Sequence, residues 1–149
     1  MPVRNAEAEW KGNLQQGGGW MKLGSGAFEG KYSFGTRFGE EPGTNPEELI
    51  GAAHAGCFSM AFAAILGGAG YTPNRIHTTE KVRIDKVGDG FQITKAELHT
   101  EAEVPGIDED TFRKLANQAK EGCPVSKALA GIPEITLDAV LLPFHEIAA

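Results

Sequence analysis

The pattern of hydrophobic and polar positions begins with a strand-like alternation. In residues 4–11, "RNAEAEWK", Ala6, Ala8 and Trp10 fall on one side and polar residues on the other, which predicts a strand with one buried face. Four glycines in "GNLQQGGGW" break the alternation, so we expect a hairpin connection into a second strand near residues 20–23. A third short strand is predicted around "KYSFGTRF", followed by the turn "GEEPGT".

A strong helix signal begins at Asn45. Asn45 is a good N-cap, Pro46 suits the first helical position, and Glu47 and Glu48 bring negative charge to the exposed N–H groups of the first turn. Residues 49–66 are then almost all small or apolar, so the helix must be covered on most of its sides. Two internal glycines interrupt this run, which argues against a membrane span and suits close approach by a neighbouring backbone.

The second half of the chain predicts a hairpin, two helices and a final strand. Two alternating runs, residues 76–87 and 90–104, flank the tight-turn signal "GDG". Asp108 caps the helix "EDTFRKLANQAKEG", and "CPVSKALAG" predicts a short second helix with Cys123 at its N-cap and Pro124 at its first position. "EITLDAVLLP" is the last predicted strand. The predicted order β-β-β-α-β-β-α-α-β is an α+β fold. The apolar stripe of the first of these two helices consists of Phe112, Leu115, Ala116 and Ala119.

Length and charge narrow the class of protein. A chain of 149 residues has the size of one ordinary domain, so we expect residues 1–149 to form a single domain. Fourteen Lys and Arg against twenty Asp and Glu give a net charge of -6 with no basic run, which argues against nucleic acid or an anionic membrane as the main partner. The charged N-terminal segment "MPVRNAEAEWKG" is neither a signal peptide nor an anchor, and a cytoplasmic location is expected.

The two cysteines, Cys57 and Cys123, are the candidate reactive groups. Two thiols do not make a disulfide framework, and in a reducing compartment they are buried, catalytic or redox-active. A small buried side chain is one reading of Cys57. Cys123 has the stronger intrinsic claim to reactivity, because a helix N-cap favours the thiolate. Cys57 lies about three turns into its helix, so a nucleophilic Cys57 needs a cation from elsewhere.

His54 and Arg37 are the candidates for activating that thiol. His54 precedes Cys57 by three positions on the same helical face, so a Cys–His pair like that of thiol hydrolases is one hypothesis. No residue that would orient the imidazole is identifiable, and a packing histidine is the alternative. Arg37, in "GTRFGE", can form a two-point pair with Glu47 or Glu48. The alternatives are a surface charge for the arginine and helix capping for the glutamates.

No metal or phosphate site is indicated. The chain contains no C-x-x-C and no H-E-x-x-H, and its glycine-rich loop matches neither common phosphate-binding pattern. The histidines fall on different predicted elements. They are His54, His77, His99 and His145.

Three segments together resemble the OsmC/Ohr family of osmotically inducible and organic hydroperoxide resistance proteins: "GTNPEELIGAAHAGCFSMAF", "VPGIDEDTF" and "AKEGCPVSKAL". The resemblance extends over nearly the whole chain, and both cysteine contexts fit. It implies a peroxidase without a cofactor, in which one cysteine attacks a hydroperoxide and a second resolves the product as a disulfide. It also implies an intertwined homodimer, in which antiparallel sheets wrap paired central helices and the active sites lie at the subunit interface.

The family pattern assigns these roles to particular residues. The reactive thiol falls on Cys57, in "AHAGCF", and the resolving thiol on Cys123, in "GCPVS", which reverses the order that the helix-dipole argument gives. The glutamate at the helix start falls on Glu47. The arginine falls on Arg37, because "TRFGE" is similar to the OsmC branch and "QQGGGWMK" lacks the arginine of Ohr-type members. His54 stands where Ohr-type proteins tend to have tyrosine, which weakens its claim to be a base.

The resemblance therefore implies the reduction of organic hydroperoxides to alcohols, with a role in oxidative or osmotic stress. A dithiol must regenerate the enzyme, either a lipoylated protein or another dithiol. An apolar wall would favour bulky substrates, because burying each CH₂ contributes about 0.8 kcal/mol. Two alternatives stay open: a non-catalytic stress or ligand-binding protein on the same fold, and a Cys–His hydrolase. The expected wall residues are Phe34, Phe38, Phe58, Met60 and Phe62.

Overall fold

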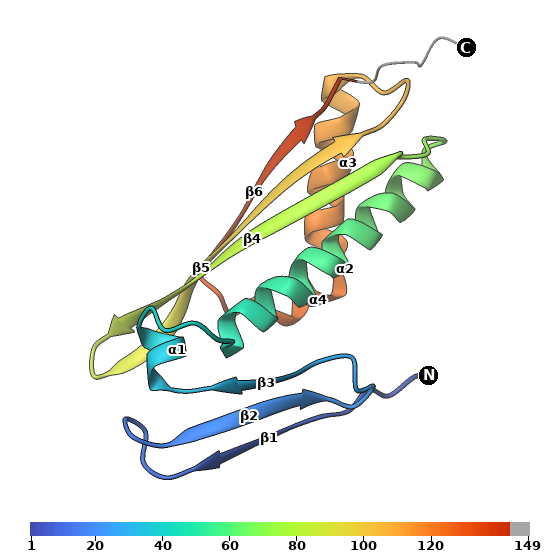
Figure 1. Cartoon of the computed structure of the whole chain (residues 1–149). Helices are drawn as coiled ribbons and strands as arrows, with labels where there is room; N and C mark the ends of the chain where they lie inside the picture. The colour runs from blue at the N-terminus through green and yellow to red at the C-terminus, as the bar shows by residue number, and fades with distance from the viewer. Residues whose placement is uncertain (144–149) are drawn as a thin grey trace. The chain divides into compact units, whose positions relative to one another are not determined.

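The computed structural model describes residues 1–143, which form two compact units divided between Leu49 and Ile50 (Figure 1). His145 lies outside the described residues. The first unit contains strands β1 (Ala6–Lys11), β2 (Gly18–Leu23) and β3 (Glu29–Tyr32), helix α1 (Phe34–Phe38) and the start of helix α2 (Pro46–Gly68). The second unit contains the rest of α2, strands β4 (Arg75–Val87), β5 (Gly90–Glu103) and β6 (Glu134–Leu141), and helices α3 (Glu109–Gly122) and α4 (Pro124–Ala128).

The first unit is built on an antiparallel sheet in the order β1-β2-β3. Gly19 pairs with Trp10 on one side and Tyr32 on the other, and the two rings meet edge to face with centroids 5.4 Å apart. A Cβ at Gly19 would lie 2.8 Å from both rings, so only glycine lets them approach. The strand was predicted to bury one face, but Ala6 and Ala8 are exposed and only Trp10 is partly buried.

A short helix replaces the second half of the predicted third strand. The strand ends at Tyr32, and the Oγ of Ser33 then accepts a hydrogen bond from the Thr36 N–H at 3.2 Å. The Thr36 Oγ1 accepts one in return from the Ser33 N–H at 2.9 Å. This reciprocal pair is a capping box, which starts a helix at Phe34 whatever the strand propensity of the aromatic residues around it.

The start of α2 agrees with the prediction. The Oδ1 of Asn45 accepts a hydrogen bond from the Glu48 N–H at 2.8 Å, as an N-cap does. The Nδ2 of Asn45 also donates to the Thr36 carbonyl at 3.0 Å. One side chain therefore both begins α2 and fixes it to α1.

The second unit contains a sheet in the order β4-β5-β6. Strands β4 and β5 form the predicted long hairpin, in which Thr78 pairs with Thr100. Antiparallel sheets were expected, but β6 runs parallel to β5, so this sheet is mixed. The reason is the connection: α3 and α4 carry the chain back along the sheet before β6 begins, as a parallel crossover requires.

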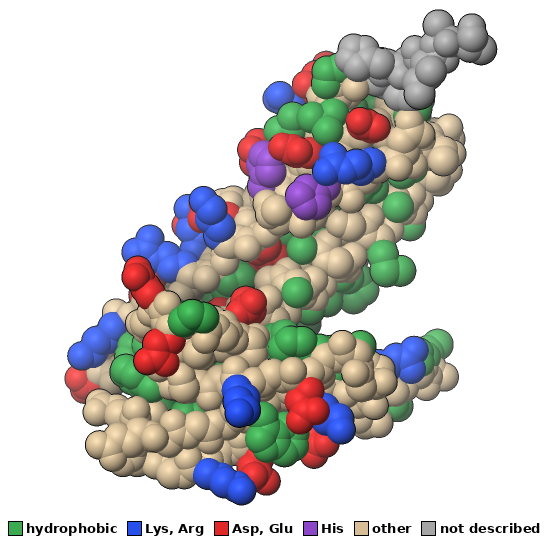
Figure 2. All heavy atoms as spheres, viewed as in Figure 1, with side chains coloured by type: hydrophobic (Ala, Val, Ile, Leu, Met, Phe, Trp, Pro, Cys, Tyr) green, Lys and Arg blue, Asp and Glu red, His purple; other side chains and the backbone are tan. Residues whose placement is uncertain are grey.

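Both long helices pack on one face of the β4–β6 sheet and form its core. Phe58 and Phe62 of α2 and Phe112 of α3 are fully buried, and the ring of Phe62 lies between the other two at centroid distances of 5.7 and 5.4 Å. Leu98 and Ala102 supply the inward face of β5. The predicted stripe of α3 is the buried one. The opposite face of the sheet carries charged side chains of both signs (Figure 2).

Helix α2 is apolar but only partly covered in the single chain. By length and composition it could cross a membrane, a test that the core helix of a globular protein also passes, and 28% of its apolar window is buried. Met60 is 76% exposed on this helix, whereas Phe58 and Phe62 are fully buried. The prediction that the helix is covered on most sides is therefore not met within one chain.

Candidate functional site

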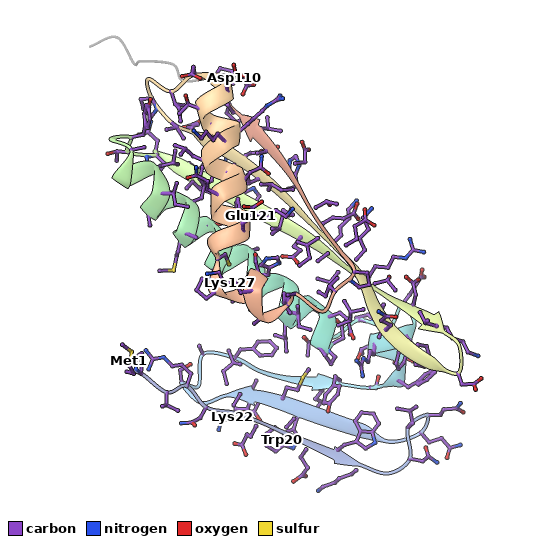
Figure 3. The ribbon with its side chains drawn as sticks, turned by 180° about the vertical axis from the view of Figure 1, so that it is seen from behind. Met1, Trp20, Lys22, Asp110, Glu121 and Lys127 are labelled. Atoms are coloured by element: carbon purple, nitrogen blue, oxygen red, sulfur yellow. The ribbon has the colours of Figure 1, made fainter. Side chains whose placement is uncertain are left out.

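The two cysteines lie side by side in the second unit. The Sγ of Cys57, on α2, is 2.8 Å from the Sγ of Cys123, and both thiols are free. A disulfide bond would bring the sulfurs to about 2.05 Å. Cys123 is fully buried and Cys57 is partly exposed. The corner between α3 and α4, located in Figure 3 by Glu121 and Lys127, carries Cys123 to α2.

Cys123 occupies a position shared by two helices. Its N–H donates to the Ala119 carbonyl at 3.0 Å and closes α3, and its carbonyl accepts from the Lys127 N–H at 3.1 Å and opens α4. Pro124 follows at the first position of α4, as predicted. The sulfur is therefore held at a helix start by backbone hydrogen bonds on both sides.

The surroundings of the two thiols separate their pKa values. Burial raises the pKa of Cys57, and the hydrogen bond with Cys123 raises it further, against a weaker opposing effect of the Val125 N–H. Burial also acts to raise the pKa of Cys123, but hydrogen bonding with Cys57, with the backbone and side chain of Ser126 and with the backbone of Val125 outweighs it, so that pKa is lowered. Cys123 is thus the more acidic thiol, and the largest effect that lowers its pKa is the hydrogen bond with Cys57.

Among residues 1–143, the groups that shift the pKa of Cys57 most are Cys123 and the Val125 backbone, and neither is a cation. Nucleophilic attack by a cysteine requires the thiolate, and burial of Cys57 disfavours that form by raising its pKa. The expectation that a nucleophilic Cys57 needs a cation from elsewhere stays a prediction.

His54 does not pair with Cys57. The Nδ1 of its fully buried imidazole is 2.8 Å from the Oε1 of Glu80 on β4, and its Nε2 is 2.7 Å from the Oγ of Ser126 on α4. Both ring nitrogens are occupied by these partners. The Cys–His pair of the hydrolase hypothesis is therefore not formed. His54 is buried as a packing histidine would be, but it also makes a polar contact through each ring nitrogen.

Glu80 and Ser126 are the residues that sequence reasoning missed. Ser126 follows Cys123 by three positions, a spacing that brings a side chain back to the start of a helix. Glu80 lies between Thr78 and Val82 at alternate positions on the inward face of β4. An acidic residue at such a position indicates a buried polar partner. Its partner on another element could not be read from the sequence.

Arg37 and Glu47 form a two-point ion pair in the first unit. The Nη2 of Arg37 lies 2.8 Å from the Oε1 of Glu47, and its Nε lies 3.1 and 3.3 Å from Oε1 and Oε2. The side chain of Glu47 is 7% exposed and that of Arg37 35% exposed. Glu48 is exposed and leaves the pair to Glu47. The guanidinium also lies over the Phe38 ring, 5.2 Å from its centroid.

An apolar pocket of about 380 Å³ lies beside Arg37 in the first unit. Of the five expected wall residues, Phe34 and Phe38 line it. Phe58 and Phe62 are fully buried in the core of the second unit, and Met60 is exposed on α2, so these three do not line this pocket. The pocket is lined by Trp10, Gly12, Leu14, Tyr32, Ser33, Phe34, Arg37 and Phe38.

Among residues 1–143, no group of three or more His, Cys, Asp or Glu side chains is arranged to hold a metal ion. The chemistry that the described residues offer is that of two neighbouring thiols, a fixed guanidinium and a buried acid–imidazole–hydroxyl row.

Comparison with known proteins gives consistent matches. The sequence profile described as OsmC-like protein matches residues 39–138. The chain is 52% identical over 136 residues to Peroxiredoxin OsmC of Escherichia coli (strain K12), a match that covers 91% of this chain and 94% of that protein. It is 32% identical over 96 residues to the organic hydroperoxide resistance protein of Xanthomonas axonopodis pv. citri (strain 306), which covers 64% of this chain and 66% of that protein. Among solved structures, an organic hydroperoxide resistance protein OsmC of Legionella pneumophila matches with a TM-score of 0.69 at 23% identity. The match covers 94% of this chain and 99% of that one, so the two share a fold.

Proposed function

Because this chain belongs to the OsmC family and is a thiol-dependent peroxidase, we propose that Cys57 and Cys123 together reduce organic hydroperoxides to alcohols. The observation that carries this proposal is the 2.8 Å separation of the two sulfur atoms. Two thiols at this distance can form a disulfide with a small movement of either side chain. The role is protection against oxidative or osmotic stress.

The reaction has two steps at sulfur. The Cys57 thiolate attacks one peroxide oxygen, the O–O bond breaks, and the alkoxide takes a proton and leaves as an alcohol. Cys57 is then a sulfenic acid. Cys123 attacks that sulfur, the S–O bond breaks, and water leaves as the disulfide forms. A dithiol, such as a lipoylated protein, returns both cysteines to thiols.

Access and acidity divide the roles between the cysteines. Cys57 is partly exposed, whereas Cys123 is fully buried, so a bulky hydroperoxide reaches Cys57 first. The lowered pKa of Cys123 makes it the better leaving group when the dithiol attacks the disulfide at Cys57. The more acidic thiol of the chain is therefore the resolving one.

Arg37 is the cation that Cys57 requires for attack. The nearly buried carboxylate of Glu47 fixes its guanidinium through Nε and Nη2, while the arginine stays 35% exposed and able to face a reacting oxygen. A guanidinium placed there favours the thiolate and stabilises the departing alkoxide. The aromatic pocket beside Arg37 fits the apolar part of an organic hydroperoxide, and not the small, polar hydrogen peroxide.

A second copy of the chain covers the exposed apolar side of α2. A helix with no charged residue beyond its first turn and with 28% of its window buried gains stability from such a partner. The active protein is then a homodimer, with each chain acting as one functional domain over residues 1–149. Free thiols and a dithiol reductant fit the reducing cytoplasm.

The test is a count of free thiols and the intact mass after one equivalent of cumene hydroperoxide, under denaturing conditions. The unmodified protein should lose both thiols and two hydrogen atoms of mass, and release cumyl alcohol. Cys57→Ser should leave the peroxide intact. If both thiols of the unmodified protein stay free and the peroxide survives, the chain is instead a binding protein on the same fold.

A further inference from the structure

Four side chains from different parts of the second unit form one hydrogen-bonded row behind the reacting sulfurs. Glu80 Oε1 lies 2.8 Å from His54 Nδ1, and His54 Nε2 lies 2.7 Å from Ser126 Oγ. Ser126 is the third residue after Cys123 at the start of α4, and hydrogen bonding by its side chain lowers the pKa of the Cys123 thiol. Cys123 in turn lies 2.8 Å from Cys57. The row thus ends at the sulfur pair that forms the disulfide.

The row is sealed from solvent. The side chains of His54 and Glu80 are 0% and 1% exposed, and Ser126 and Cys123 are also buried. A proton on any of these groups cannot exchange freely with water while the unit stays folded. A proton that leaves Cys123 therefore needs a partner inside the protein.

The donors and acceptors of the row fit two proton arrangements. In the first, the Nδ1–H of His54 donates to the Glu80 carboxylate, the Ser126 hydroxyl donates to Nε2, and the Cys123 thiol donates to the Ser126 oxygen. In the second, the thiol proton has moved to Ser126 and the hydroxyl proton to Nε2. The result is a thiolate and an imidazolium. The same pairs of atoms are hydrogen-bonded in both arrangements, with donor and acceptor exchanged at Ser126, and the total charge is unchanged.

Glu80 brings a carboxyl group to the row, although a neutral side chain could make the same hydrogen bond to His54. Glu80 Oε2 is buried and has no hydrogen-bond partner among the described residues. An ionised carboxylate with one unpaired oxygen is costly to bury, and a neutral amide would orient the imidazole equally well. A carboxyl group 2.8 Å from Nδ1 can, in contrast to an amide, stabilise a positive charge on the imidazole.

The order acid, imidazole, hydroxyl is also that of serine hydrolases. Here the hydroxyl contacts a sulfur of the same chain, and the imidazole is fully buried. No substrate carbonyl can approach Ser126 in this arrangement, so the row serves the thiol.

We propose that Glu80, His54 and Ser126 form a proton relay, which takes the thiol proton of Cys123 as this sulfur attacks the Cys57 sulfenic acid. The proposal rests on the proposed peroxidase function. In the attack the S–S bond forms and the S–O bond breaks. The thiol gives up one proton to His54 through Ser126, and the departing hydroxide takes one proton from solvent at the partly exposed Cys57 and becomes water. When a dithiol reduces the disulfide, Cys123 leaves as a thiolate and the relay returns its proton.

Ser126 touches the reacting sulfur and is a catalytic residue, whereas His54 and Glu80 are positioning residues that act through it. The titratable groups in contact with the relay come from each packed element: Cys57 from α2, Glu80 from β4 and Cys123 from the α3–α4 corner. Cys57 is the only one of these that a substitution can remove without breaking the relay.

The first experiment therefore follows the thiolate absorbance of Cys123 against pH in Cys57→Ser protein, which needs no peroxidase activity and no access of a reagent. Adding His54→Gln, which cannot take up a proton, should move the ionisation of Cys123 upward by about one pH unit or more. Ser126→Ala should do the same. His77→Gln, an exposed histidine on β4, is the matched control and should leave the curve in place.

The second experiment uses the protein with both cysteines and follows sulfenic acid and disulfide separately by rapid mixing with cumene hydroperoxide. Glu80→Gln and His54→Gln should leave sulfenic acid formation unchanged and slow disulfide formation by about a hundredfold at neutral pH. The rate in these variants should recover at high pH, where Cys123 ionises without help. A structural role alone would not produce this recovery.

The two experiments also separate the relay from the proposed function. An absorbance shift without peroxide consumption would keep the proton path from Cys123 to His54 but overturn the peroxidase and, with it, the step that the relay serves. If the His54→Gln and Ser126→Ala curves coincide with the parent curve, there is no relay, whatever the activity. Circular dichroism checks the fold of each variant. If His54→Gln fails to fold, the ionisation of Cys123 in Ser126→Ala, which removes a single oxygen atom, tests the relay instead.

Discussion

The Sγ atoms of Cys57 and Cys123 lie 2.8 Å apart although 66 positions separate them in the chain. The contact depends on α2 crossing the corner where α3 ends and α4 begins. It places the more acidic thiol in the buried position and the less acidic one toward solvent. In the mechanism that we propose, a sulfenic acid formed at Cys57 is therefore in contact with the thiol that resolves it from the moment it forms.

Removing that partner should change the product. Cys123→Ser is expected to react once with cumene hydroperoxide and then to proceed to the sulfinic acid at Cys57, because no thiol captures the sulfenic acid. Intact mass should show one added oxygen at low peroxide and two at higher peroxide. The unmodified protein at the same doses should show only the disulfide. A Cys123→Ser protein that turns over with a dithiol as fast as the unmodified protein would exclude a resolving role.

Arg37 should control the first step. Arg37→Gln is expected to slow sulfenic acid formation by about a hundredfold at neutral pH, through loss of the charge beside the developing anions. Without that cation the pKa of Cys57 stays raised by burial, so the rate should keep increasing with pH well into the alkaline range. Single-turnover rates measured across pH test both points. Arg83→Gln, at an exposed arginine, is the control.

Glu47 should matter only through Arg37. Glu47→Gln keeps the shape of the side chain but removes the charge that holds the guanidinium by three contacts, so we expect a smaller loss than for Arg37→Gln. The double variant should be no slower than Arg37→Gln alone, because the two residues act as one unit. Additive losses would mean that Glu47 has a separate role.

The exposed side of α2 should be an interface between copies. Met60→Asp places a charge on the apolar surface of this helix and is expected to convert a dimer into a monomer in analytical ultracentrifugation. Gln118→Asp, on the exposed side of α3, adds the same charge elsewhere and should leave the assembly unchanged. An unmodified protein that sediments as a monomer would overturn the homodimer.

Asp108 should make the stability of α3 depend on pH. Hydrogen bonds from the Thr111 N–H and hydroxyl lower the pKa of this carboxyl, so its stabilising effect is present above the unfolded value of about 3.9 and is lost as pH falls through the folded value. Asp108→Ala is expected to lower Tm by about 2–4 °C at neutral pH. Asp108→Asn still caps but does not titrate, so its difference from the unmodified protein should change only in acid.

The sequence by itself determined the features that depend on neighbouring residues. The N-cap at Asn45, the hairpin of β4 and β5, the helix that starts after Asp108 and the short helix after Cys123 all follow from patterns a few residues long. Local hydrogen bonds and periodic burial decide such features, and both are written in consecutive positions. The cysteine contexts were also readable, and with them the family.

Only the tertiary structure decided which distant groups meet. Strand β6 runs parallel to β5, and Arg37 pairs with Glu47 rather than with Glu48. His54 contacts Glu80 and Ser126 and does not pair with Cys57. Each of these contacts joins separate elements, and its energy depends on burial and on the exact partner that packing brings within reach. A sequence shows which residues can ionise, donate or accept, but the environment that sets their acidity exists only once the elements have packed.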